Sequence, residues 1–255
     1  MGMPRIIAIA NQKGGVGKTT TTANLGAALA TMGHRVLLID LDPQGNLTSS
    51  FGLERQTERT IADALLDRRI PLPVRHVMNS SSGSLDVVPS ALTLASAEAA
   101  LMTKLGRELR LRDQLATVSD QYDCALIDTP PSLGLLTVNA MVAATGVIVP
   151  TEARFFSLQG LQMLQETVEE ILYLNDRLRI IGILLSKLDR RLREERTVAE
   201  FLRNRWGDLV FDTEIGTNSK ILEASSAATP IFHYPGAEKA VEAYLRLAEE
   251  VIQRA

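Results

Sequence analysis

Short apolar runs alternate along the chain with longer segments in which apolar residues recur at helical spacing. The apolar runs predict buried strands over Ile6–Ala10, Arg35–Asp40, Leu85–Pro89, Tyr122–Asp128, Gly146–Pro150, Ile180–Leu185 and Leu209–Asp212. The periodic segments predict helices over Thr19–Met32, Leu92–Val118, Leu133–Ala143, Leu158–Asn175, Glu194–Trp206, Lys220–Ser226 and Glu238–Gln253. Continuously apolar strands separated by helices are typical of a doubly wound α/β fold, in which helices cover both faces of a mostly parallel sheet.

The chain contains no tandem repeat, no low-complexity tail and no convincing linker. The loosest stretches, Pro71–Pro73 and Asn79–Ser84, are interpreted as surface loops. We therefore expect residues 1–255 to form a single domain, which is within the usual size range for an α/β fold. Because the first strand begins by residue 5, there is no room for an N-terminal helix-turn-helix, and any DNA binding would come from this domain.

Composition narrows the class of protein. Hydrophobic residues make up 45% of the chain and aromatic ones 4%, which suits a core of Ala, Leu, Val and Ile. The formal net charge of -3 argues against a wholesale polyanion binder but leaves room for a local basic patch. The single cysteine, Cys124, excludes a disulfide framework and most zinc sites. No signal peptide or membrane-length apolar run is present, so a soluble, cytoplasmic protein is expected.

The run from Asn11 to Thr20, Asn-Gln-Lys-Gly-Gly-Val-Gly-Lys-Thr-Thr, follows the first predicted strand and opens the first predicted helix. Its glycines let successive backbone N–H groups surround an anion, and the positive end of the helix dipole points to the same place. Lys18 is expected to reach the β- and γ-phosphates, and the Thr19 hydroxyl to bind Mg²⁺. The residues expected to bind the nucleotide here are Lys13, Gly14, Gly15, Val16, Gly17, Lys18, Thr19 and Thr20.

This loop departs from the standard phosphate-binding pattern. Gln12 occupies the place of the usual first glycine, and a second lysine, Lys13, follows it. Because the loop already surrounds the phosphates, Lys13 cannot easily fold back onto its own nucleotide. We predict that it reaches a nucleotide on a facing subunit, in a role similar to that of an arginine finger. The alternative is an ordinary exposed lysine on a glycine turn.

Two carboxylates follow predicted strands, where they would complete a nucleotide site. Asp42, within Leu37–Asn46, is expected at the carboxyl edge of the sheet, where it would position the attacking water. Asp128 ends the strand of the segment Ala125–Pro131 and matches a magnesium-side carboxylate. The predicted catalytic residues are thus Lys13, Lys18 and Asp42, and the predicted Mg²⁺ ligands are Thr19, Asp42 and Asp128. Either aspartate alone would also fit a turn cap.

A third candidate, Leu185–Asp189, follows another predicted strand. It weakly resembles the guanine-reading motif Asn-Lys-x-Asp, but Ser186 stands in place of the asparagine. A solvated turn is the favoured interpretation.

Together these motifs resemble the ParA/MinD group of deviant-loop ATPases, and specifically the short, Soj-like ParA partition ATPases. The resemblance runs nearly end to end and rests on Gln12–Thr20, Leu41–Asn46, Asp128–Ser132 and the stretch from Gly236 through the final helix. It implies ATP and Mg²⁺ as cofactors and an ATP-bound homodimer that binds double-stranded DNA without sequence preference. It also implies a ParB-like stimulating protein, a cargo to be segregated or positioned, and a cytoplasmic, nucleoid-associated location.

The resemblance also implies roles for particular residues. Lys13 matches the lysine that crosses the dimer, Lys18 and Thr19 match the phosphate and magnesium residues, and Asp42 and Asp128 match the hydrolytic and magnesium-side aspartates. The segment Thr213–Ser225 resembles the family pattern Ile-Pro-Arg-Asn-Val-Arg-Leu-x-Glu-Ala, which implies adenine contacts for Gly216 and Asn218. Lys220 and Arg191 fall at positions of DNA-contacting arginines. The chain departs from the family pattern at Arg154, Gly216, Thr217 and Lys220.

A basic stretch supports DNA binding independently of the resemblance. The segment from Lys187 to Arg205 contains seven basic residues and four acidic ones, which gives it a local net charge of +3. Such a surface binds phosphate backbones without reading bases. The candidate DNA-binding residues are Arg190, Arg191, Arg193, Arg196 and Lys220. The alternative is a solvated helix with ordinary Glu/Arg pairs.

Other functions remain to be weighed. A MinD-like membrane-cycling ATPase needs a basic amphipathic terminal helix, whereas Glu238–Arg254 carries both charges and is predicted to pack on the core, so no membrane partner is expected. An iron–sulfur carrier needs paired cysteines, and Cys124 stands alone. A positioning ATPase for a non-DNA cargo and an ATP-dependent ligase of the dethiobiotin-synthetase kind stay open.

Overall fold

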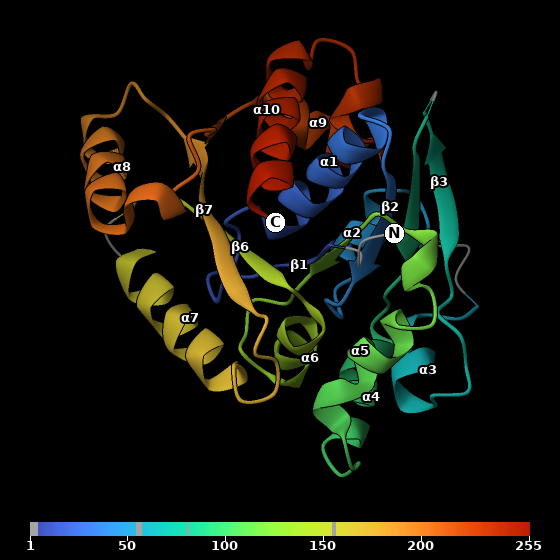
Figure 1. Ribbon diagram of the computed structural model, residues 1–255. Coiled ribbons are helices and arrows are strands. Elements are labelled where there is room, and N and C mark those ends of the chain that lie inside the picture. Colours follow the sequence, from blue (N-terminus) through green and yellow to red (C-terminus); the bar gives the residue numbers. More distant parts are fainter. Residues whose placement is uncertain (1–4, 55–57, 81, 155–156) are drawn as a thin grey trace.

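The computed structural model describes residues 5–54, 58–80, 82–154 and 157–255. One eight-stranded sheet runs through it in the order β3-β4-β2-β5-β1-β6-β7-β8. The strands are β1 Arg5–Ile9, β2 Arg35–Asp40, β3 Arg75–Asn79, β4 Ser84–Val88, β5 Cys124–Asp128, β6 Gly146–Thr151, β7 Arg179–Leu188 and β8 Ile215–Gly216. Every neighbouring pair is parallel except β3–β4. The predicted doubly wound, mostly parallel α/β fold is confirmed (Figure 1).

Helices cover both faces of this sheet. They are α1 Lys18–Thr31, α2 Asn46–Ser49, α3 Ile61–Leu66, α4 Thr93–Leu101, α5 Arg110–Leu115, α6 Leu135–Ala143, α7 Ser157–Ile171, α8 Arg193–Trp206, α9 Ser219–Ser226 and α10 Glu238–Arg254. One hydrophobic core lies under α1, α9 and α10, and a second lies under α3 to α8. Successive residues of a strand supply opposite cores, because side chains alternate across a strand: Ile7 and Ile9 belong to the first core and Ala8 to the second.

Helix α1 lies unusually close to the sheet. A Cβ atom on Gly26 would come within 2.6 Å of Leu38 Cδ2, so a larger residue would require the Leu38 side chain to shift. The helix is rich in small residues and nearly all of it is buried. This packing fixes the N-terminus of α1, and with it the loop that precedes the helix, against the carboxyl ends of β1 and β5.

Two expectations about secondary structure are wrong. The helix predicted over Leu92–Val118 is divided into α4 and α5, with Gly106 at φ +62° and a 3₁₀ turn between them. α4 ends at Leu101, before Gly106, and Gly106 adopts its left-handed conformation without steric cost at the start of the 3₁₀ turn that leads into α5. The strand predicted over Leu209–Asp212 is reduced to one bridge between Val210 and Ile183. The first residue of the predicted strand, Leu209, belongs instead to a 3₁₀ turn over Gly207–Leu209.

The edge strands β3 and β8 and the short helices α2 and α3 were not predicted. β3 is half exposed and antiparallel to β4, so it lacks the continuous apolar run of a central strand. The loose stretch Asn79–Ser84 connects these two strands; residue 81 lies outside the described residues, and the Ser80 amide donates to the Gly83 carbonyl. A Cβ atom on Gly83 would lie 2.3 Å from the Ala30 carbonyl oxygen, so this stretch packs directly against the end of α1.

The final helix packs on the core, as predicted. Tyr244, Leu247 and Val251 of α10 are fully buried, and α10 lies beside α1 (Figure 1). Its apolar face is therefore already covered within the chain. Among the described residues, no helix combines the length and the apolar character needed to span a bilayer.

Candidate functional site

The loop between β1 and α1 has the backbone conformation of an anion-binding turn. Gly15 and Gly17 adopt φ values of +77° and +88°, which L-residues other than glycine rarely reach. A Cβ atom at either position would meet nothing within 4 Å, so the backbone angle, not lack of space, requires glycine. Because α1 begins at Lys18, directly after the turn, its free N–H groups and the positive end of its dipole face the same hollow.

Lys18 is buried at the centre of this loop. Its Nζ donates to the carbonyl oxygens of Asn11 (3.0 Å) and Lys13 (3.3 Å). Burial lowers the pKa of Lys18, and the nearby carboxylates of Asp128 and Asp42 oppose that effect. The ammonium group thus holds the loop curled around the space that an anion would enter.

Asp128 lies fully buried at the end of β5, directly behind the start of α1. It accepts hydrogen bonds from the hydroxyls of Thr19 (2.7 Å) and Thr22 (3.4 Å). Burial raises the pKa of Asp128 well above its ordinary value, and the neighbouring Asp40 raises it further. A nearby cation would stabilise the ionised form of a carboxylate in this position.

The oxygen ligands at this place fit Mg²⁺, which prefers hydroxyl, carboxylate and phosphate oxygens. In the described part of the chain, no group of three or more His, Cys, Asp or Glu residues is arranged to hold a metal ion. Thr19 and Asp128 therefore suit a magnesium ion that arrives with phosphate oxygens.

Asp42 follows β2 in a turn that Asp40 fixes. Asp40 accepts hydrogen bonds from the Thr48 amide (2.8 Å), the Thr48 hydroxyl (2.7 Å) and the Asp42 amide (3.2 Å). Burial raises the pKa of Asp40 to about 6. The Asp42 carboxylate accepts a hydrogen bond from the Gln44 amide (2.9 Å). Sequence reasoning selected Asp42 and missed Asp40, although the strand-end position of Asp40 in Asp40-Leu41-Asp42 was a usable signal.

These elements surround a cavity of about 440 Å³. Among the residues that line it are Gly14, Gly15, Gly17, Lys18, Thr19, Thr20 and Asp42. Val16 is buried behind the loop, where its carbonyl oxygen accepts a hydrogen bond from the Ser186 hydroxyl (2.7 Å). The structure thus brings the predicted loop residues and Asp42 to one hollow, with Asp128 beneath it.

Lys13 does not line this cavity. Its Nζ lies 3.1 Å from Glu152 Oε2, just after β6. Asn11 ties the two segments together, because its side-chain amide donates to the Pro150 carbonyl (2.7 Å) and its Oδ1 accepts from the Lys13 amide (3.0 Å). Arg154 also lies within 3.4 Å of the Glu152 carboxylate. Lys13 is therefore held at Glu152 and does not line the hollow, although Lys187, which does line it, lies 3.9 Å from the same carboxylate.

Lys187 is a residue that sequence analysis did not select. It forms a bulge in β7 at φ +55°, and its side chain lines the cavity and donates to the Gly15 carbonyl. The Thr217 hydroxyl holds the Lys187 carbonyl oxygen at 2.9 Å. Bulges often redirect a side chain beside a functional site. The solvated-turn interpretation fits Asp189, which pairs with Arg191, but not Lys187 or Ser186.

The two residues expected to contact adenine lie apart from the phosphate loop cavity. Gly216 lines a separate hollow of about 720 Å³, together with Arg190 and Glu214. Asn218 caps α9, because its Oδ1 accepts a hydrogen bond from the Lys220 amide (2.9 Å). Their predicted role therefore stays a prediction.

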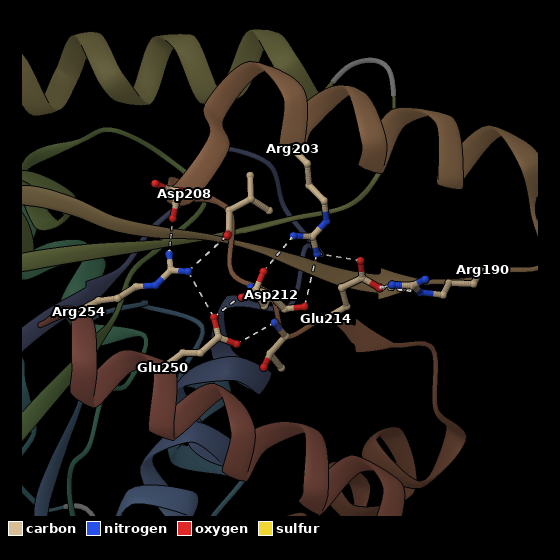
Figure 2. Close-up of polar contacts among 9 residues, drawn as sticks. Arg190, Arg203, Asp208, Asp212, Glu214, Glu250 and Arg254 are labelled. Carbon is tan, nitrogen blue, oxygen red and sulfur yellow. Dashed lines mark hydrogen bonds and ion pairs between the residues drawn. The ribbon is translucent and has the colours of Figure 1, made fainter.

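The basic stretch is less positive than its sequence suggests. Glu214 pairs with Arg190 at 2.6 Å, and Figure 2 shows the two side chains in contact. Arg191 pairs with Asp189 and Lys220 with Glu223, at 2.7 Å each. Arg193 and Arg196 on α8 are exposed and make no ion pair with any residue that the structure describes. Glu214 escaped the sequence count because it lies beyond the stretch that was counted.

Comparison with known proteins supports one family. A family model described as "AAA domain" matches residues 4–180. The sporulation initiation inhibitor protein Soj of Bacillus subtilis is 43% identical over 98% of this chain and 98% of its own length. The chromosome partitioning protein ParA of Caulobacter vibrioides is 45% identical over 98% of this chain and 94% of its own length.

Among solved structures, cobyrinic acid a,c-diamide synthase from Mycobacterium smegmatis, with bound ADP and magnesium, aligns with a TM-score of 0.83. It is 32% identical, and the alignment covers 98% of this chain and 95% of that one. The cell division ATPase MinD of Pyrococcus furiosus aligns with a TM-score of 0.81 at 25% identity, covering 99% of this chain and 100% of that one. With near full-length identity above 40% to Soj and ParA, the chain belongs to the ParA/Soj-type family of AAA-domain P-loop ATPases.

Proposed function

We propose that this protein is a ParA-type partition ATPase. In this proposal it hydrolyses ATP with Mg²⁺, forms a homodimer on ATP binding, binds double-stranded DNA without sequence preference, and segregates or positions a cargo with a ParB-like partner. The observation that carries the proposal is the pair of lysines in one loop. Lys18 is buried inside the loop, whereas Lys13 pairs with Glu152 and does not line the cavity.

The loop residues divide the work of binding and hydrolysis. Backbone N–H groups of the loop and the Lys18 ammonium bind the triphosphate. Thr19, Asp42 and Asp128 would hold Mg²⁺, and the ion would neutralise negative charge on the phosphate oxygens. Asp42 also orients the attacking water, and the bond from the Gln44 amide fixes its carboxylate for that task. Asp40 positions Asp42 by accepting a hydrogen bond from its amide.

Lys13 gives dimerisation a physical reason. Its ammonium group pairs with Glu152 and does not line its own hollow. In the proposed dimer it would stabilise transferred phosphate charge in the second copy of the chain. When two subunits close face to face, the Lys13 ammonium group of each leaves the Glu152 carboxylate and contacts the triphosphate of the other subunit. The triphosphate carries more negative charge than the carboxylate. ATP is then the condition for the dimer, because without the triphosphate Lys13 keeps its internal partner.

DNA binding would use α8, where Arg193 and Arg196 are exposed and unpaired among the described residues. A dimer presents this surface twice, so two weak phosphate contacts act at a high effective concentration. A ParB-like partner would stimulate hydrolysis and so release the dimer. The protein would then cycle between the cytoplasm and the nucleoid.

An ATP-dependent amidation is the alternative, because the Mycobacterium smegmatis relative carries the name of a diamide synthase. The greater and equally complete identity to Soj and ParA favours partition. ATP turnover that depends on a carboxylic acid and ammonia or glutamine, and not on DNA with a partner, would favour the amidation. An iron–sulfur carrier gains no support, because the one cysteine, Cys124, is buried in β5.

The proposal is tested by ATP turnover and by mass in solution. Asp42→Ala should bind ATP, lose hydrolysis by about 10²-fold or more, and accumulate as a dimer with ATP and Mg²⁺. Lys18→Ala should lose ATP binding and remain monomeric. The matched control is Asp176→Ala, which removes an exposed carboxylate away from the cavity. Hydrolysis by Asp42→Ala at the control rate would rule out the assigned role.

A further inference from the structure

Glu214 precedes the two-residue strand β8 and holds two arginines of the basic stretch. Its carboxylate accepts a hydrogen bond from Arg190 Nε (2.8 Å), lies 2.6 Å from Arg190 Nη2, and lies 3.0 Å from Arg203 Nη2 (Figure 2). The Glu214 side chain is only 11% exposed, whereas that of Arg190 is 73% exposed. An exposed arginine is thus anchored by a nearly buried carboxylate.

The segment that carries Glu214 is itself held in place. Glu250 of α10 accepts hydrogen bonds from the Asp212 amide (2.9 Å) and the Thr213 amide (2.7 Å). Arg254 in turn pairs with Glu250 at 3.3 Å and donates to the Asp208 carbonyl at 2.8 Å. Figure 2 shows this chain of contacts from α10 to Glu214. The backbone just before Glu214 is therefore tied to α10 through the amides of Asp212 and Thr213.

These contacts set up a competition. A DNA phosphate that takes Arg190 must break a two-point pair and leave a nearly buried carboxylate with Arg203 as its remaining partner. The phosphate gains one contact at a solvated surface, where ion pairs contribute little. Arg193 and Arg196 carry no such internal cost.

We propose that Glu214 is an internal competitor of DNA phosphate for Arg190, which keeps this arginine off the DNA and limits affinity. The inference rests on the proposed DNA binding. It assigns the contact surface to Arg193 and Arg196, with Arg190 neutralised by its own chain. The Arg190–Glu214 pair occurs once in each subunit. In this proposal, the Glu214 carboxylate of each subunit lowers the affinity of the dimer for DNA.

The experiment measures binding of a labelled non-specific duplex to the full chain with a non-hydrolysable ATP analogue, across a series of salt concentrations. The slope of log affinity against log salt is negative, and each arginine that Glu214→Gln releases should make it steeper by about 0.9. This corresponds to a rise in affinity of about eightfold near 0.1 M salt. The double variant Glu214→Gln with Arg190→Ala should return the slope to the wild-type value.

The matched control is Glu249→Gln. Glu249 lines the same hollow and is exposed, but it pairs with no arginine among the described residues. It should leave the slope unchanged and the affinity within about twofold, because its exposed charge holds no arginine in the described part of the chain and is screened by salt. An equal gain in both variants would mean a general charge effect and would overturn the inference.

A second measurement uses the unaltered protein, in case Glu214→Gln unfolds. Modification of arginines by phenylglyoxal, followed by peptide mass analysis, should show that DNA protects Arg193 and Arg196 several-fold more than Arg190. Equal protection of Arg190 would refute the competition. If the wild-type protein binds no DNA with either ADP or the ATP analogue, the proposed function itself fails. Normal ATP-dependent binding with an unchanged slope in Glu214→Gln removes this inference alone.

Discussion

Replacing Glu152 by glutamine should tighten the ATP-dependent dimer. In the free chain, Lys13 Nζ lies 3.1 Å from the Glu152 carboxylate, and the two side chains are 39% and 15% exposed. A pair at this depth contributes about 1 kcal/mol, the upper end of the range for exposed ion pairs. Both subunits must break their pair when each lysine crosses to the other nucleotide. The variant should therefore favour the dimer by about 2 kcal/mol, or about 30-fold in its dissociation constant.

Sedimentation velocity over a range of protein concentrations, with Mg²⁺ and a non-hydrolysable ATP analogue, measures this constant directly. The matched control is Arg154→Ala, which removes another cation, 3.4 Å from the same carboxylate, but leaves Lys13 paired. It should change the constant by less than about threefold, since an exposed pair contributes little. The double variant Lys13→Ala with Glu152→Gln should lose the gain. An unchanged or weaker dimer in Glu152→Gln would refute the reasoning.

Three further outcomes are expected. Arg193→Ala combined with Arg196→Ala should lower the salt slope of DNA binding by about 2 per subunit, measured by fluorescence anisotropy. Folding favours the protonated form of Asp40, because burial raises its pKa from the ordinary value of 3.8 to about 6. This contribution to stability is present at low pH and is lost as pH rises toward and through 6. Relative to Asp40→Asn, the wild type should therefore lose about 2 kcal/mol of unfolding free energy between about pH 4.5 and about pH 7.5, measured with urea. Gly182→Ala should destabilise by about 1–3 kcal/mol in the same assay, because its Cβ would lie 2.1 Å from the buried Phe211 ring.

Local signals in the sequence were enough to predict the centre of the fold. The strand before Asn11, the glycine turn and the helix from Lys18 each follow from residues within one short segment. The same holds for Asp42 and Asp128, because strand ends place polar residues at the carboxyl edge of a parallel sheet. The break after Leu101 was missed because the helical periodicity continues through it, and that pattern outweighed the glycine at position 106, which adopts φ +62°.

Contacts between distant segments could not be predicted. Lys13 and Glu152 are 139 residues apart, and their pairing depends on β1 and β6 being neighbours in the sheet. Arg190 and Glu214 are 24 residues apart and meet because β7 pairs with β8, a strand of two residues with no sequence signal. Counting charges within one stretch therefore overestimated the free positive charge. The carboxylates that neutralise it come from elements that only the fold brings together.

The central claim is that ATP joins two subunits into one DNA-binding unit, and one measurement tests it most directly. Affinity for a non-specific duplex is compared with ADP and with a non-hydrolysable ATP analogue, both with Mg²⁺, while light scattering reports the mass of the protein. The account predicts a doubled mass and a tenfold or greater rise in DNA affinity with the analogue alone, on the order expected when a weak site acts twice. Equal affinity for DNA with both nucleotides, or a protein that stays monomeric when saturated with the analogue, would contradict it.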